Sequence, residues 1–162
     1  MTHLWQPNEV RIANSQMTRF QHYVEQRFDQ TFPTYDALHK WSVTDTDDFW
    51  GAVWDFCDVK ATTPYHRVTS NLDKFPGTAW FEGCELNFAE NMMHHNDDRV
   101  ALIGLLENGQ RSSYTYAALY HEVERLVSAM RHHGVTQGDR IAGLMPNTPE
   151  TIIAMLATTA IG

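Results

Sequence analysis

Nine histidines are the residues of this 162-residue sequence that most readily suggest chemistry, because imidazole binds metals and exchanges protons near neutral pH. Four of them form the adjacent pairs His94-His95 and His132-His133, and neighbouring residues on a helix do not face one site. The pair His121-Glu122 begins like the zinc motif H-E-x-x-H, but Arg125 occupies the position of the second histidine ligand. We therefore predict solvated or core-rim histidines and no metal site.

The cysteines and the paired carboxylates also have ordinary structural interpretations. Cys57 and Cys84 are far apart and form no C-x-x-C pair, so we expect unpaired thiols in apolar surroundings and a reducing compartment. The acid pairs Asp47-Asp48 and Asp97-Asp98 are typical of helix starts and turns, where carboxylates stay in solvent. Glycine-rich phosphate loops and the G-x-S-x-G nucleophile pattern are absent. The residues themselves indicate no catalytic, cofactor-binding or metal-binding side chain.

The composition is that of an acidic globular protein. The net charge of −8 makes nucleic acid a poor partner, since phosphate binding needs a basic face. The 5 Trp, 8 Phe and 6 Tyr argue against intrinsic disorder, because disordered chains are poor in aromatic residues. No apolar run approaches the roughly 20 residues that cross a bilayer, and the first residues do not resemble a signal peptide. These features predict a cytoplasmic protein without a membrane span.

Residues 1–90 have the pattern of an aromatic helical region. Ser15 is the predicted N-cap of a helix that runs to about Phe28. Thr34 is the predicted N-cap of a short helix that carries Leu38 and Trp41. Residues 58–83 show little periodicity and are predicted to be rich in loops.

A third helix of this region should begin near Asp45, and Asn87 should cap a fourth. The third helix carries one wide apolar stripe, formed by Phe49, Trp50, Val53, Trp54 and Cys57. We interpret this stripe as facing the core. The alternative is an aromatic docking surface for another domain, which requires that the chain be incomplete.

From about residue 97 the pattern changes to alternating strands and helices. Residues 100–106 form a continuous apolar run, typical of a strand buried on both faces, and Asn108-Gly109 predicts a hairpin turn into a return strand at 111–114. Thr115 should cap a helix that ends before Gly134, and residues 140–145 should form a second buried strand. Thr148-Pro149 then begins an almost entirely apolar helix. This order predicts a parallel α/β layer.

Several stretches resemble acyl-CoA synthetases of the adenylate-forming superfamily. Residues 80–91 are similar to the family segment W-F-x-G-x-x-L-N-[YF]-A-E-N. The opening of the family's AMP-binding domain is matched in order by residues 114–119, 134–142, 145–150 and 155–162. The start of the chain and the tryptophans at 41, 50 and 54 narrow the resemblance to the acetoacetate–CoA ligase group. Glu82 and Met92-Met93 depart from the more common Pro and Leu.

The resemblance implies a helical N-terminal cap over residues 1–90, followed by an incomplete AMP-binding α/β domain over residues 91–162. It implies an ATP-dependent ligation of acetoacetate to CoA, with Mg²⁺, in a protein several times longer. The family's phosphate loop, ATP and Mg²⁺ residues, acyl pocket, CoA-binding residues and catalytic lysine lie beyond Gly162, so none is carried over. The cap would wrap the large domain through Phe20, Trp41, Trp50 and Trp54.

We therefore interpret residues 1–162 as an inactive N-terminal fragment that binds no cofactor by itself. The final apolar helix has nothing after it to cover it, so we expect exposed apolar surface and self-association. One alternative is the same region of another short-chain acyl-CoA ligase, of the acetate or propionate type. The other is a stand-alone, non-catalytic interaction module.

Overall fold

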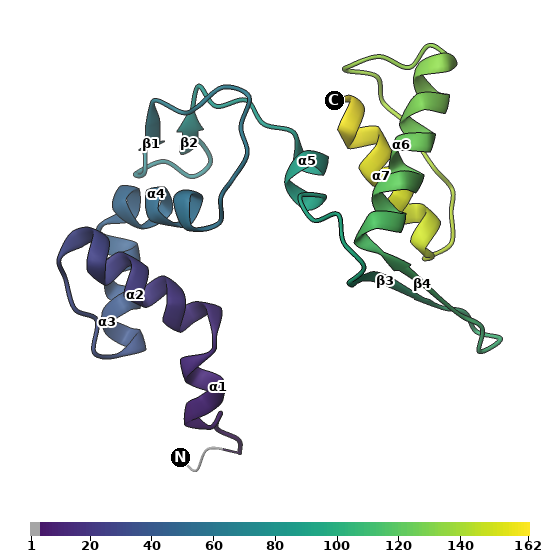
Figure 1. The fold of residues 1–162 in the computed structure, drawn as a ribbon. Coiled ribbons are helices and arrows are strands. Elements are labelled where there is room, and N and C mark those ends of the chain that lie inside the picture. The colour runs from purple at the N-terminus through teal and green to yellow at the C-terminus, as the bar shows by residue number, and fades with distance from the viewer. Residues whose placement is uncertain (1–3) are drawn as a thin grey trace. The chain divides into compact units, whose positions relative to one another are not determined.

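The computed structural model of the protein describes residues 4–162, which divide into two compact units (Figure 1). The first unit consists of residues 4–59 and 63–84, and the second of residues 60–62 and 85–162. Each unit combines helices with one two-stranded sheet, in agreement with the predicted mixed α/β class. No helix within residues 4–162 is long and apolar enough to cross a membrane.

The helices of the first unit are α1 (Glu9–Ala13), α2 (Gln16–Phe28), α3 (Tyr35–Thr44) and α4 (Thr46–Phe56). The predicted caps are confirmed. The Ser15 hydroxyl accepts a hydrogen bond from the Thr18 N–H at 3.1 Å, and the Thr34 hydroxyl accepts one from the Ala37 N–H at 3.2 Å. Each bond satisfies an N–H group that the first helical turn leaves without a partner.

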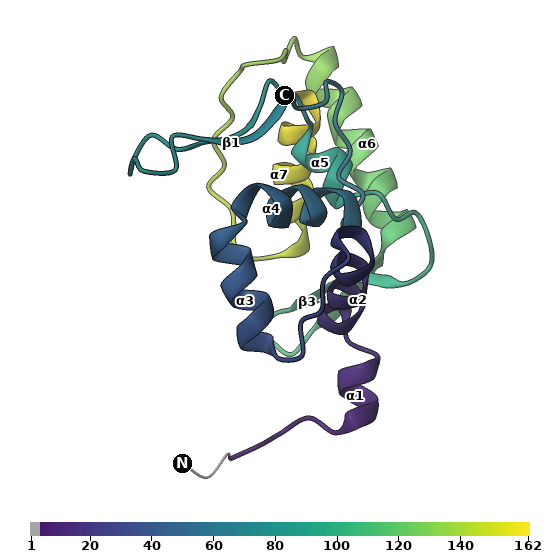
Figure 2. The same cartoon turned by 90° about the vertical axis from the view of Figure 1, so that its left-hand side faces the viewer.

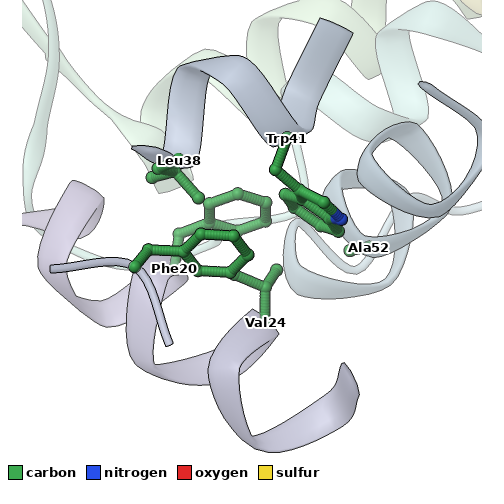
Figure 3. Packing of buried hydrophobic residues seen from close by; sticks show 6 residues of the cluster. Phe20, Val24, Leu38, Trp41 and Ala52 are labelled. Carbon is green, nitrogen blue, oxygen red and sulfur yellow. The ribbon is translucent and has the colours of Figure 1, made fainter. Parts of the chain in front are cut away.

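The core of the first unit lies between α2, α3 and α4 (Figure 3). Its buried members are Phe20, Val24, Phe32, Leu38, Trp41 and Ala52. The ring of Phe49 meets the rings of Phe20 and Trp41 edge-on, at centroid distances of 5.7 and 5.8 Å. Phe20 and Trp41 therefore lie inside this unit, and the prediction that they wrap a larger domain is wrong.

A short β-hairpin covers the other side of α4. Its strands, β1 (Arg67–Ser70) and β2 (Ala79–Glu82), are antiparallel, with Thr69 opposite Trp80. The buried Thr69 hydroxyl donates a hydrogen bond to the Asp47 carboxylate in the first turn of α4. The prediction of a loop-rich stretch missed this hairpin, because strands of four residues are too short to show an alternating pattern.

The apolar stripe of α4 is divided between these two neighbours. Phe49 and Val53 pack against the helical core. The ring centroid of Trp54 instead lies 4.6 Å from that of Phe81, and the ring centroid of Trp50 lies 5.6 Å from that of Trp80. Trp50 remains 38% exposed, so a single core-facing stripe is the wrong description of this helix.

The second unit contains α5 (Phe88–Met92), β3 (Val100–Leu105), β4 (Arg111–Thr115), α6 (Tyr116–His132) and α7 (Pro149–Ile161). Helices α6 and α7 lie side by side, and α5 packs against α7 (Figures 1 and 2). Their shared core consists of Ala89, Leu119, Val123, Ile153, Leu156 and Ala157.

The predicted ends of α6 are confirmed. Thr115 caps its start by accepting from the Ala118 N–H at 3.1 Å. Gly134, with φ +87°, follows its last turn. The N–H groups of Gly134 and Val135 donate to the carbonyls of residues 131 and 130, each at 3.0 Å. This pair of bonds is the Schellman ending that a glycine favours.

The strand predictions for this unit are only partly correct. β3 and β4 form the predicted antiparallel hairpin, but residues 140–145 form no strand. A strand requires a hydrogen-bonded neighbour, and within residues 4–162 none pairs with that segment. Val100 and Leu105 of β3 are 56% and 69% exposed, because α6 and α7 cover only one face of the hairpin. The predicted parallel layer is therefore not formed by the described residues.

Candidate functional site

The histidines within residues 4–162 do not come together as a metal centre. His94 and His95 follow α5 and their ring centroids lie 3.9 Å apart, so the expectation that this pair would diverge is wrong. The Glu122 carboxylate is paired with Arg125 at 2.8 Å. In the described part of the chain, no three His, Cys, Asp or Glu side chains are grouped to hold a metal ion.

The positions of the two cysteines and of Asp97 are explained by the local structure around them. Cys84 is half-buried, but Cys57 is exposed because it forms the C-cap of α4, so the expected apolar burial is wrong for Cys57. Asp97 accepts hydrogen bonds from the Arg99 guanidinium at 2.7 to 3.0 Å. These bonds hold the pKa of the Asp97 carboxyl below its ordinary value.

Asn87, in the family-like segment 80–91, connects two helices of the second unit. Its side-chain oxygen accepts from the Glu90 N–H at 3.2 Å and so caps α5. Its side-chain amide donates to the Thr159 carbonyl at 2.9 Å and to the Ala160 carbonyl at 3.4 Å. These carbonyls lie in the last turn of α7, where the Thr159 carbonyl also accepts from the N–H of the C-cap residue Gly162 at 3.2 Å. One amide side chain thus serves the start of one helix and the end of another.

Asn91, four residues later, fastens the segment to the chain that precedes β1. Its side-chain oxygen accepts from the Lys60 N–H at 2.8 Å, and its amide donates to the Lys60 carbonyl at 2.9 Å. The same amide donates to the Asn87 carbonyl at 2.9 Å. An asparagine supplies both the donor and the acceptor that this reciprocal pairing requires.

Changing Asn87 to Asp should separate these two roles. Aspartate still caps α5, but it has no amide to donate, and it places a negative charge beside the carbonyl end of α7. We expect a loss of about 1 kcal/mol in the free energy of unfolding, as for one net hydrogen bond. Urea unfolding followed by circular dichroism measures this change. Equal stability of the wild type and N87D would show that the bonds to α7 contribute nothing.

The glycine in this segment is required by the backbone. Gly83 has φ +81°, a conformation that L-residues with side chains seldom adopt. A Cβ atom at this position would lie 2.5 Å from Nδ1 of His66. The fixed glycine of the family segment is therefore explained by the turn after β2.

The later family-like stretches also form turns and helix ends. The Asp139 carboxylate accepts from the Thr136 N–H at 2.8 Å and the Thr136 hydroxyl at 3.1 Å, which closes the turn that contains Gly138. Thr148 is the N-cap of α7, although its side chain makes no capping bond, and Pro149 is the first helical residue. Hydrogen bonding by the Thr148 side chain lowers the pKa of Glu150 at this end. The polar side chains of Thr136, Asp139 and Thr148 therefore form hydrogen bonds within their own turn or helix end.

The hollows of the two units differ in character. One of about 320 Å³ in the first unit is almost entirely apolar and is bordered by Phe20, Leu38 and Phe56. One of about 580 Å³ in the second unit lies between α6, α7 and residues 141–145. The first hollow has the His39 imidazole and the Cys57 thiol at its border, and the second has no titratable side chain in its lining.

Comparison with known proteins matches two families to successive parts of the chain. Residues 35–92 match the family described as the acetyl-coenzyme A synthetase N-terminus, and residues 88–162 match the AMP-binding enzyme family. The chain is 37% identical over 98% of its length to an acetoacetyl-coenzyme A synthetase of Rhizobium meliloti. It is 34% identical over 98% of its length to a malonamoyl-CoA synthetase of Penicillium aethiopicum.

A solved structure is equally similar. The acetoacetyl-CoA synthetase from Streptomyces lividans has a TM-score of 0.90 and 38% identity, over 100% of this chain. The chain spans 24% and 23% of the two curated relatives and 26% of the solved structure, or about a quarter of each. The two family matches follow each other along the chain, from the N-terminal region into the AMP-binding enzyme region. The chain is therefore a homologue of the N-terminal quarter of acetoacetyl-CoA synthetases, and its residues 88–162 match the AMP-binding enzyme family.

Proposed function

We propose that the whole protein containing this sequence is an acid–thiol ligase that activates acetoacetate with ATP and transfers it to CoA. In the first step the carboxylate attacks the α-phosphate of ATP, which gives an acyl-adenylate and pyrophosphate. The CoA thiol then displaces AMP. The observation that carries this proposal is the 37% identity to an acetoacetyl-coenzyme A synthetase over 98% of the chain. We propose that Mg²⁺ accompanies ATP and that the enzyme is cytoplasmic.

We further propose that residues 1–90 form the N-terminal cap and that residues 91–162 begin the AMP-binding domain. Their role is to position helices and turns, and the chemistry belongs to residues outside this sequence. The hydrogen bonds of Asn87 and Asn91 support this role, because both family-like asparagines are occupied by backbone groups. On this proposal the partners are the remainder of the protein and its small-molecule substrates.

A panel of acids tests the substrate. The protein expressed from the complete reading frame should form a CoA thioester fastest with acetoacetate, measured by chromatography of the products. The second candidate is a ligase for another short acid, and the similarity to a malonamoyl-CoA synthetase favours including malonamate beside acetate and propionate. Faster turnover of any of these acids would replace acetoacetate as the proposed substrate.

The isolated chain should self-associate. Large apolar side chains such as Phe75 and Leu144 are fully exposed, and Trp80 is 46% exposed. Apolar surface of this kind favours association in water. Size-exclusion chromatography with light scattering should show a mass that increases with concentration. A monomer at every concentration would contradict this expectation.

A further inference from the structure

The connection between α5 and β3 places basic side chains on the first turn of α6. The His95 ring lies 3.9 Å from the His94 ring and 5.3 Å from the ring of Tyr116, the first residue of α6. The Arg99 guanidinium lies 5.6 Å from the same Tyr116 ring. Positive charge is unfavourable at the N-terminal end of a helix, where the helix dipole is itself positive.

Backbone hydrogen bonds fasten this connection to the helix. The Tyr116 N–H donates to the Arg99 carbonyl and the Ala117 N–H donates to the Asp97 carbonyl, each at 3.0 Å. The next N–H, of Ala118, is taken by the Thr115 hydroxyl. All three N–H groups are therefore occupied. None of them is left to bind an anion that would offset the positive charge.

The side chains around His95 favour its neutral form. His95 is half-buried, and this burial, followed by the charges of His94 and Arg99, holds its pKa below the ordinary value of 6.5. The Asp97 carboxylate acts in the opposite direction, but it is already engaged by Arg99. The His94 Nδ1 atom lies 2.8 Å from the Asn91 carbonyl, which can only accept, so Nδ1 is the donor in this bond.

We propose that residues 94–99 form a pH-sensitive clasp on the first turn of α6, closed while His95 is neutral and loosened when His95 takes up a proton. The closed form lowers the proton affinity of His95, so the open form binds the proton more tightly. The stabilisation is fully present above about pH 6.5 and is lost as the pH falls below that value. The clasp would tie the stability of the α5–β3 connection to pH.

Amide hydrogen exchange on the full 162-residue chain at pH 7.5 and pH 5.5 tests the clasp. After correction for intrinsic exchange, protection of the Tyr116 and Ala117 amides should fall on acidification relative to the Val123 amide. One proton allows a change of at most about tenfold per pH unit. Equal relative protection at both pH values would overturn the proposal.

Two variants separate the clasp from general acid sensitivity. His95→Phe keeps an aromatic ring against Tyr116 and cannot be protonated, so the pH dependence should disappear. His133→Phe, at the other end of α6, is the matched control and should leave it intact. Should His95→Phe fail to fold, NMR titration of wild-type His95 decides the matter. The Tyr116 amide should shift with the His95 titration, and a titration without that response would refute the clasp.

Discussion

Replacing Trp41 with Ala should lower the free energy of unfolding of the first unit by about 3–5 kcal/mol, the usual cost of truncating a buried aromatic residue. Trp41 is 5% exposed, and its ring lies 5.1 Å from Phe32 and 5.3 Å from Phe28. The small side chain would leave a cavity at the centre of three helices. Urea unfolding followed by circular dichroism measures the loss.

Two further variants test whether burial of the Trp41 ring causes this loss of stability. Trp50→Ala removes a side chain whose residue is 38% exposed, so it should cost less than Trp41→Ala. Trp41→Phe should also be mild, because the Trp41 Nε1–H has no hydrogen-bond partner within residues 4–162 and most of the ring is kept. Equal losses for Trp41→Ala and Trp50→Ala would contradict the assignment of Trp41 to the core.

Replacing Gly104 with Ala should destabilise the second unit by about 1–3 kcal/mol, the usual cost of overpacking. Gly104 is the buried residue of β3, and Pro149 at the start of α7 lies directly against it. An added Cβ atom would lie 2.9 Å from two ring carbons of Pro149 and 2.7 Å from the Ser112 hydroxyl. The hydroxyl can rotate away, but the proline ring can move only with the helix.

Thermal unfolding measures this prediction, and Gly143→Ala is its control. A Cβ atom at Gly143 would meet only the flexible Met145 side chain, at 3.5 Å. G143A should therefore unfold near the wild-type temperature, whereas G104A should unfold several degrees lower. Matching temperatures for the two variants would show that β3 and α7 are not in close contact.

Structural features that depend on neighbouring residues were predicted correctly from the sequence. The caps at Ser15, Thr34 and Thr115 and the ending at Gly134 are local signals, and each is confirmed. An Asn-Gly turn likewise predicted the β3–β4 hairpin. Such features require only a few adjacent residues to satisfy one another.

Features that depend on distant partners were predicted less well. The apolar run at 140–145 has the composition of a strand, but composition does not supply a hydrogen-bonded neighbour. The division of α4 between Trp41 and Trp80 depends on a hairpin whose strands are too short to show a pattern. The hydrogen bonds from Asn91 to Lys60 join residues 31 positions apart, so no local sequence pattern predicts them.

The family-like segments illustrate the same distinction for the candidate site. The pattern in residues 80–91 indicated the family, but it did not indicate what the residues do. The structure shows that Asn87 joins α5 to α7 and that Asn91 holds Lys60. The absence of catalytic, cofactor-binding and metal-binding residues in this region remains a prediction.

We propose that this region is structural and that the ligase chemistry belongs to the longer protein. ATP–pyrophosphate exchange dependent on acetoacetate tests it most directly, because exchange reports formation of the acyl-adenylate alone. The 162-residue chain should show no exchange above background, and the protein from the complete reading frame should show exchange only when acetoacetate is present. Exchange by the purified 162-residue chain, or none by the longer protein with any acid tested, would contradict the account.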